Sequence, residues 1–175
     1  MAKAQVFSLD IVIAMGIFIL ILVSTALIWQ YSRGKITIEE TRNDMETIAR
    51  NALSVLAETK GNPTNWTGYA FNTTSIKSLG IAEEFLVLDS EKISSLSSEN
   101  YSAAKTILGI LGPNYEFGIT IKVWNGSSYA ADYTIGSYPN ATAYEIIHLE
   151  RHVLFNSTWA KASIDLWKSC RHVTC

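Results

Sequence analysis

Residues 3–16 read KAQVFSLDIVIAMG, and they begin an apolar run that continues to Trp29. Between Ile11 and Trp29 there is no charged residue, and at about 1.5 Å per residue this stretch makes roughly 28 Å of helix. That length matches the hydrocarbon core of a bilayer, so the run can span a membrane. Asp10 nevertheless places a carboxylate in the first turns of this apolar helix.

Beyond the apolar run the sequence continues as an amphipathic helix. Apolar side chains recur at spacings of three and four residues, and charged side chains fill the opposite side. The apolar positions are Ile38, Thr41, Met45, Ile48, Ala52, Leu53 and Leu56. Because only residues 32–35 separate the two halves, we expect one continuous helix over residues 6–59. Gly61 and Pro63 then supply a left-handed cap and a stop.

The remaining residues predict two short helices and a sheet. One helix is expected in SEKISSLSS (90–98), with Ser90 as its N-cap, and one in ENYSAAKTILGIL (99–111), ended by Gly112 and Pro113. Before them, a short strand or turn is expected near residues 85–88.

From Tyr115 onward the apolar pattern has a period of two residues, which is typical of β-strands. Strands are expected at residues 115–123, 129–135, 144–155 and 159–167, with Asn125-Gly126 forming a hairpin turn. The inward side chains of the first and last strands are Tyr115, Phe117, Ile119, Ile121 and Val123, and Ala160, Ala162, Ile164 and Leu166. The sequence therefore predicts an α+β fold, in which the long N-terminal helix packs on a small antiparallel β-sheet head through residues 45–56.

Composition excludes some classes of function. The formal charge of −2, with 17% charged residues, provides no basic field, so we do not expect nucleic-acid binding. Six Asn-x-Ser/Thr sequons follow the apolar run, and they favour an extracellular head that carries N-linked glycans. The sequon asparagines are Asn65, Asn72, Asn100, Asn125, Asn140 and Asn156.

The sequence gives little support for catalysis or for a cofactor. Cys170 and Cys175 are too few for a disulfide scaffold. Because the head is expected to be extracellular, we expect them to form one disulfide at the C-terminal end of the chain. A metal site made by these cysteines and His172 is the weaker alternative. His148 and His152 fall four residues apart in an expected strand, roughly 13 Å from each other, so they do not form a chelating pair. We therefore expect no metal, no cofactor and no enzymatic role.

Three tryptophans, Trp66, Trp124 and Trp167, fit two interpretations. They can line an adhesive surface, or they can pack against the sheet, as large aromatic side chains more often do.

Two ordinary interpretations of the apolar run remain open. It can be a cleaved secretory signal, with the small residues Ser24-Thr25-Ala26 at the cleavage site and Leu27 as the new N-terminus, although Asp10 cancels the positive charge of the preceding region. It can also be an uncleaved signal anchor that holds a single extracellular binding domain.

Asp10 itself has two interpretations. If a peptidase removes the N-terminus just before Gln5 or Val6, the new α-amine lies about 6 to 7.5 Å along the helix from the carboxylate. Two such helices with a stagger of about one turn can pair the amine of one with Asp10 of the other, which fixes their register. Alternatively, Ser8 caps the helix and Asp10 only interacts with the helix dipole.

The stretch Lys3-Ala4-Gln5, then Ser8 and Asp10, then the apolar helix, resembles the class III signal peptides of archaeal type IV pilin-like proteins. The resemblance implies that Lys3 belongs to a short leader, that the cut lies beside Ala4, Gln5 and Val6, and that Asp10 is the acidic position of the mature chain. Ala4 stands where the family usually has glycine, and a cut before Gln5 makes Asp10 the sixth mature residue where the usual position is the fifth.

Parts of the head are also similar to archaeal pilin-like and pseudopilin-like proteins. These are Gly61-Asn62-Pro63-Thr64-Asn65-Trp66, Leu79-Gly80-Ile81-Ala82, and the pattern from Glu150-Arg151 through Lys161 to Trp167. The resemblance implies a leader at 1–5, a transmembrane and filament-core helix at 6–34, an amphipathic continuation at 35–60 and an extracellular head at 61–175.

The resemblance also implies a function and a set of partners. Before assembly the chain would be a single-pass membrane protein, and it would then polymerise with copies of itself into an extracellular pilus-like filament. A prepilin peptidase, a cytoplasmic assembly ATPase and a polytopic platform protein would serve this process. The alternatives are a minor pseudopilin that primes or tips another filament, and the membrane-anchored binding domain.

Overall fold

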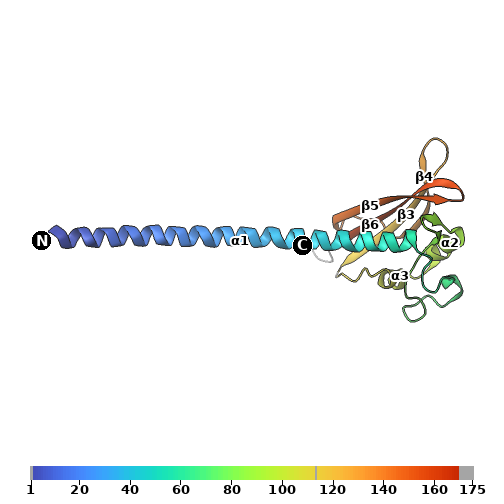
Figure 1. The fold of residues 1–175 in the computed structure, drawn as a ribbon, viewed down its shortest axis with the longest axis horizontal. Helices are drawn as coiled ribbons and strands as arrows, with labels where there is room; N and C mark the ends of the chain where they lie inside the picture. The colour runs from blue at the N-terminus through green and yellow to red at the C-terminus, as the bar shows by residue number, and fades with distance from the viewer. Residues whose placement is uncertain (1, 113, 170–175) are drawn as a thin grey trace. The chain divides into compact units, whose positions relative to one another are not determined.

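The computed structural model of the chain describes the backbone of residues 2–112 and 114–169, and their side chains except those of residues 2–8, 34–40, 131 and 132 (Figure 1). It divides into two compact units, Met1–Thr41 and Arg42–Cys175. We call the second the head unit. Helix α1 (Ala2–Glu58) belongs to both units, and it begins four residues before the expected start. The predicted α+β fold is confirmed.

The predicted amphipathic face of α1 packs into the core of the head unit. Its buried residues are Met45, Ala49, Ala52, Leu53, Leu56 and Ala57. The alanines at 49 and 57 extend the expected face, and their small side chains let the helix approach the sheet closely. Thr41 and Ile48 are half-buried, whereas the side chain of Ile38 lies outside the described residues.

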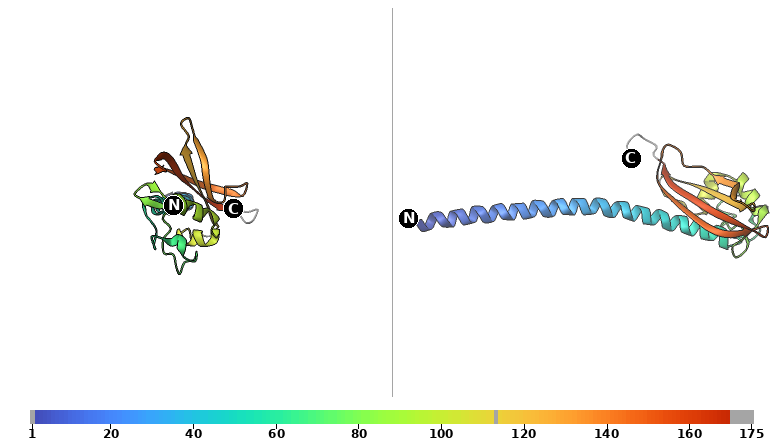
Figure 2. Two further views of the ribbon diagram at one scale, coloured as in Figure 1. Left: turned by 90° about the vertical axis from the view of Figure 1, so that its right-hand side faces the viewer. Right: turned by 90° about the horizontal axis from the view of Figure 1, so that it is seen from above.

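A six-stranded sheet covers this face of α1. Its strands are β1 (Ala82–Glu84), β2 (Val87–Leu88), β3 (Tyr115–Trp124), β4 (Tyr129–Gly136), β5 (Ala143–Phe155) and β6 (Thr158–Ser169). They lie in the order β1-β2-β5-β6-β3-β4. Figure 2 shows β5 and β6, in orange to red, curving over the last turns of α1.

The sequence predicted an antiparallel sheet, but one pair of strands in the structure is parallel. The two residues of β2 pair parallel to Leu154 and Phe155 of β5. Parallel neighbours need a crossover connection, and α2 (Ser90–Ser98), α3 (Tyr101–Ile107) and the β3–β4 hairpin provide it. The other strand pairs are antiparallel.

The inner face of the sheet is the one that α1 covers, and the expected alternation is confirmed there. The last strand buries Ala160, Ala162, Ile164 and Leu166, and the first long strand buries Tyr115, Phe117, Ile119 and Ile121. Helices α2 and α3 add Ile93, Leu96 and Ala104 to the same core. No helix among the described residues covers the opposite face, which we call the outer face.

One local prediction, the N-cap of α2, needs correction. Asp89 caps α2, and Ser90 is the first helical residue, because the Asp89 carboxylate accepts hydrogen bonds from the backbone N–H groups of Glu91 and Lys92. The expected hairpin between β3 and β4 is confirmed, with a four-residue loop in which Gly126 has a φ of +94°. Asn125 contributes through its side chain, as described below.

The C-terminal end of α1 is tied to the segment that follows it. The backbone N–H groups of Ile81, Leu86 and Ala82 donate to the carbonyl oxygens of Leu56, Ala57 and Thr59, and the Lys92 ammonium donates to the carbonyl of Lys60 at 2.9 Å. Burial lowers the pKa of Lys92, although Asp89 opposes this effect. Gly61 has a φ of +82°, as expected for the residue that turns the chain after the helix.

Candidate functional site

The apolar part of α1 is exposed along its length. Leu9–Arg33 is long and apolar enough to cross a membrane, by length and composition, and none of it is buried. Its large apolar side chains are between 50% and 67% exposed. The hydroxyls of Ser24 and Thr25 donate to carbonyls four residues earlier, each at 2.8 Å, so they need no water.

The C-terminal end of this stretch carries aromatic and basic residues. The Arg33 guanidinium lies 5.1 Å from the centroid of the Trp29 ring, and Tyr31 is also exposed. Indole and guanidinium groups are typical of the boundary between hydrocarbon and headgroups.

Asp10 lies inside α1, one residue after the apolar stretch begins, and its side chain is exposed. It forms no ion pair with the residues whose side chains the structure describes. Ser8 also lies inside the helix, so it is not the N-cap of α1. The helix includes Ala4, Gln5 and Val6, whose side chains lie outside the described residues, as does the side chain of Lys3.

The six sequon asparagines are all exposed, and four of them shape the local backbone. In these four, the side-chain Oδ1 accepts a hydrogen bond of 2.9 to 3.0 Å from the backbone N–H of the sequon Ser or Thr. They are Asn72, Asn100, Asn125 and Asn140. The bond occupies the oxygen and leaves Nδ2, the nitrogen that a glycan would modify. Asn65 makes no side-chain cap bond, and Asn156 has a φ of +49°.

The expected disulfide partners Cys170 and Cys175, and the alternative metal ligand His172, lie outside the described residues.

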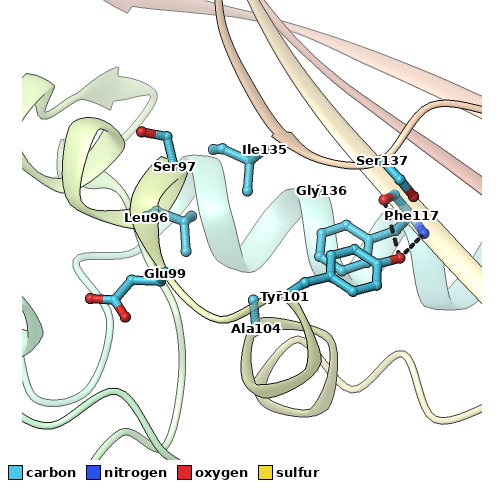
Figure 3. Close-up of a pocket in the computed structure, with 9 residues that line it drawn as sticks. All are labelled: Leu96, Ser97, Glu99, Tyr101, Ala104, Phe117, Ile135, Gly136 and Ser137. Atoms are coloured by element: carbon cyan, nitrogen blue, oxygen red, sulfur yellow. Dashed lines mark hydrogen bonds between the residues drawn. The ribbon is translucent and has the colours of Figure 1, made fainter.

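A pocket of about 200 Å³ opens between α2, α3 and the strands β3 and β4 (Figure 3). Its apolar lining comes from Leu96, Ala104, Phe117 and Ile135. Ser97, Glu99 and Ser137 supply its polar groups. Figure 3 shows the Tyr101 ring lying against Phe117, with the two ring centroids 4.9 Å apart.

Tyr101 is held firmly at this pocket. Its hydroxyl donates to Glu116 Oε2 at 2.5 Å and accepts from the backbone N–H of Phe117 at 3.0 Å. Burial and the bond to Glu116 raise the pKa of Tyr101 to about 12, so the phenol stays neutral at physiological pH. Among the residues that line the pocket, Glu99 is the one carboxylate. The pocket can therefore hold a small apolar group, and its described lining offers no nucleophile beside a base.

Charged pairs cross the outer face of the sheet between β5 and β6. His148 Nδ1 lies 2.6 Å from Asp165 Oδ1, and Lys161 donates to Glu150 Oε1 at 2.7 Å. The bond from Lys161 lowers the pKa of Glu150. His152 is also exposed on this face, one row nearer the β5–β6 turn.

The structure separates the tryptophans that the sequence had grouped. Trp66 and Trp167 are buried, so the adhesive interpretation is wrong for these two, whereas Trp124 is 37% exposed. Sequence reasoning missed Trp159, which is 60% exposed on the outer face. The signal was present, because Ala160 was expected to face inward and its neighbour must then face outward.

Comparison of the chain with protein-family models, with curated proteins and with solved structures finds no match to any of them.

Proposed function

We propose that this chain is a structural subunit of an extracellular type IV pilus-like filament that polymerises through the apolar part of α1. The observation that carries the proposal is the exposed, membrane-length stretch Leu9–Arg33, with a carboxylate at Asp10 that has no ion-pair partner among the described side chains. This combination suits a helix that must leave lipid and meet a second helix.

The carboxylate makes isolation in lipid unfavourable. Insertion scales assign about 2.5 to 3.5 kcal/mol to an Asp at the centre of a membrane helix, and less near its ends. An α-amine created at Gln5 or Val6 of a neighbouring subunit would neutralise Asp10. The lone subunit therefore carries a penalty that the assembled helices relieve.

The apolar side chains supply most of the free energy of such a core. After extraction from lipid, a bare helix of Ile, Leu, Val and Phe must bury its surface against copies of itself, at about 0.8 kcal/mol per buried CH₂. One heterologous contact that repeats without closing generates a helical filament.

By the resemblance described above, a prepilin peptidase removes the leader, and an assembly ATPase with a platform protein extracts the subunit. In this proposal the head unit lies outside the cell, first on a single-pass membrane protein and then on the filament surface. A minor pseudopilin would use the same helix at the start or the tip of another filament.

A single-pass anchored binding domain is the main competitor, because it would carry the same apolar helix. N-terminal sequencing of the mature protein, together with electron microscopy of material sheared from cells, separates the two. We expect an N-terminus at Gln5 or Val6 and lipid-free polymers. An intact residue 1 or 2 on a protein that stays in the membrane fraction would contradict the proposal, and an N-terminus at Leu27 would indicate an ordinary secreted protein.

A further inference from the structure

Another pocket opens where the end of α1 meets the start of α2. Its volume is about 340 Å³. We call it the sequon pocket, because Asn65 and Thr67, the first and third residues of one sequon, both line it. The rest of its wall is mostly charged. The charged lining residues are Lys60, Glu83, Asp89, Glu91 and Lys92.

The mixed charge of the sequon pocket favours a hydroxyl-rich occupant. Lys92 and Asp89 already bind backbone groups. The side chains of Lys60, Glu83 and Glu91 make no hydrogen bond or ion pair within the described part of the chain, so they remain available to a ligand. An anion would meet two free carboxylates, and a cation would meet two ammonium groups. A neutral hydroxyl group, by contrast, both donates and accepts hydrogen bonds.

The sequon is held firmly at the rim of this pocket. Its middle residue, Trp66, is fully buried, and the indole donates a hydrogen bond to Gly80. The backbone N–H of Gly68 donates to the Asn65 carbonyl oxygen at 3.1 Å. Asn65 itself is exposed and makes no side-chain cap bond. The attachment point of a glycan is therefore fixed in relation to the pocket.

This arrangement distinguishes Asn65 from other sequon asparagines. Asn72, Asn100, Asn125 and Asn140 each use Oδ1 to close a local turn. The pocket between α2, α3, β3 and β4 has no sequon asparagine in its described lining. Asn65 thus combines a side-chain amide that closes no turn with a polar cavity beside it.

A sugar attached at Asn65 needs only weak contacts to occupy the sequon pocket. Tethering makes binding intramolecular, with an effective concentration on the order of millimolar for a short link. The volume of the pocket lies near the lower end of the range for ligand pockets, which is about 300 to 1,000 Å³. It therefore suits the proximal sugars of a glycan, and a longer chain would continue into solvent.

We propose that Asn65 carries an N-linked glycan whose proximal sugar occupies the sequon pocket and stabilises the junction of α1 and α2. In the attachment step, Nδ2 of Asn65 forms a bond to the anomeric carbon of a lipid-diphosphate sugar donor and loses a proton. The bond from that carbon to the diphosphate oxygen breaks, and the diphosphate leaves with the bonding electrons. Attachment at Asn65 rests on the extracellular head of the proposed function, since N-linked glycans occur on secreted and surface domains.

The test compares full chains from their own cells, purified in detergent micelles, after peptide mapping by mass spectrometry has located the sugars. We expect a glycan on Asn65 of the original protein. Asn65→Gln and Thr67→Ala both remove this sequon, so each should lower the melting temperature by about 3 °C or more. Thr67→Ser keeps the sequon and should melt like the original protein.

Two controls separate the effect of the sugar from that of the asparagine. In cells that attach no N-glycans, the original protein and Asn65→Gln should melt alike, because Asn65 makes no cap bond. Asn125→Asp removes a sequon in the β3–β4 loop but keeps the acceptor of its local turn. It should leave the melting temperature of the glycosylated protein unchanged.

The reactivity of Lys60 reports where the sugar lies. A sugar in the sequon pocket covers this exposed ammonium group, so acetic anhydride should acetylate Lys60 severalfold more slowly in the glycosylated original protein than in Asn65→Gln. Lys77 is also exposed, and it should react equally in both proteins.

Four results would each overturn the proposal. They are the absence of a sugar at Asn65, equal melting temperatures of the glycosylated original protein and Asn65→Gln, an equal loss for Asn65→Gln in the unglycosylated chains, and unchanged acetylation of Lys60. Electron microscopy of filaments tests the proposed function separately, because assembly through α1 does not need the sequon pocket.

Discussion

The indole Nε1 of Trp66 donates a buried hydrogen bond of 2.8 Å to the carbonyl oxygen of Gly80. This bond joins residues 61–66 to residues 79–82. A second contact joins the same part of the chain, since Asn62 and Ser78 form an isolated antiparallel bridge. A Cβ atom at Gly80 would lie 2.1 Å from the carbonyl oxygen of Thr59. Gly80 is therefore the point at which the chain passes close to the end of α1.

We predict that Gly80→Ala destabilises the head unit severely. The added methyl group would meet backbone atoms, which cannot move aside as a flexible side chain can, so the free energy of unfolding should fall by about 3 kcal/mol or more. Urea denaturation of the full chain in detergent, followed by near-ultraviolet circular dichroism, measures the change. Gly68→Ala is the matched control, because a Cβ there has no atom within 4 Å. Equal midpoints for the two variants would show that this contact does not constrain the fold.

The alternation of β3 and β6 shows why much of the fold was predictable. Ile119, Ile121 and Ile164 repeat with a period of two over long strands, and this repetition fixes which face is buried. By contrast, β2 has two residues, too few to show any period, and its parallel pairing with β5 depends on the crossover between them. The close approach at Gly80 likewise depends on a contact with Thr59, which lies 21 positions earlier in the numbering.

The candidate site was predictable where it depends on local pattern. Exposure of the sequon asparagines follows from their turn-rich surroundings, and the apolar stretch is evident from composition. Sequence reasoning did not find that Trp124 and Trp159 are neighbours on the outer face of the sheet, because this depends on strand register. The partner of Asp10 is expected in another copy of the chain, and neither one sequence nor one subunit contains it.

Tyr101→Phe should reveal a stability contribution that depends on pH. Removing the hydroxyl leaves Glu116 and the Phe117 N–H without this partner, so we expect a loss of about 1 to 2 kcal/mol near neutral pH. The folded state raises the pKa of Tyr101 from 10.0 to about 12. The stabilising effect is therefore fully present below about pH 10 and is lost as the pH rises through about 12.

The measurement is the difference in unfolding free energy between the original protein and Tyr101→Phe at a series of alkaline pH values. Burial lowers the pKa of Lys92, but this residue is present in both proteins, so its titration cancels in the difference. Tyr69→Phe, at an exposed tyrosine, serves as the control and should change little. A difference that stays constant up to pH 12 would contradict the role assigned to the Tyr101 hydroxyl.

The sequon at Asn125 separates folding from glycosylation. Oδ1 of Asn125 accepts from the backbone N–H groups of Ser127 and Ser128, at 3.0 and 2.9 Å. Asn125→Asp keeps this acceptor and removes Nδ2, so we expect loss of one glycan with a change in stability below about 0.5 kcal/mol. Asn125→Ala should lose the glycan and also about 1 kcal/mol. Intact mass of protein from its own cells, and urea denaturation of deglycosylated protein, check the two parts. An unchanged mass for Asn125→Asp would exclude Asn125 as a glycan carrier.

A fragment that begins at Arg42 should fold without the apolar stretch. All the buried apolar residues of the core, from Met45 to Leu166, belong to the head unit. We expect residues 42–175 to be soluble and monomeric, with a cooperative thermal transition, because removal of residues 1–41 deletes no described core contact. Size-exclusion chromatography and calorimetry provide the measurement. Aggregation of this fragment, or a broad transition without cooperativity, would show that the first unit is needed for folding.

Substitution of Asp10 tests how the subunits find their register. Asp10→Ala removes a charge that is unfavourable in lipid, so membrane insertion should persist or improve, by up to the roughly 2.5 to 3.5 kcal/mol that insertion scales assign to a central Asp. Loss of the pairing with a neighbouring α-amine should reduce filament yield at least tenfold, which corresponds to about 1.4 kcal/mol per subunit contact.

Asp10→Glu keeps the charge and should retain partial assembly, whereas Asp10→Asn should behave like Asp10→Ala. Asp44→Ala, at an exposed carboxylate in the head part of α1, is the matched control and should assemble normally. The yield is measured by quantifying sheared filaments against the membrane-bound pool. Normal filaments from Asp10→Ala would remove the register role of this carboxylate and leave the fold unaffected.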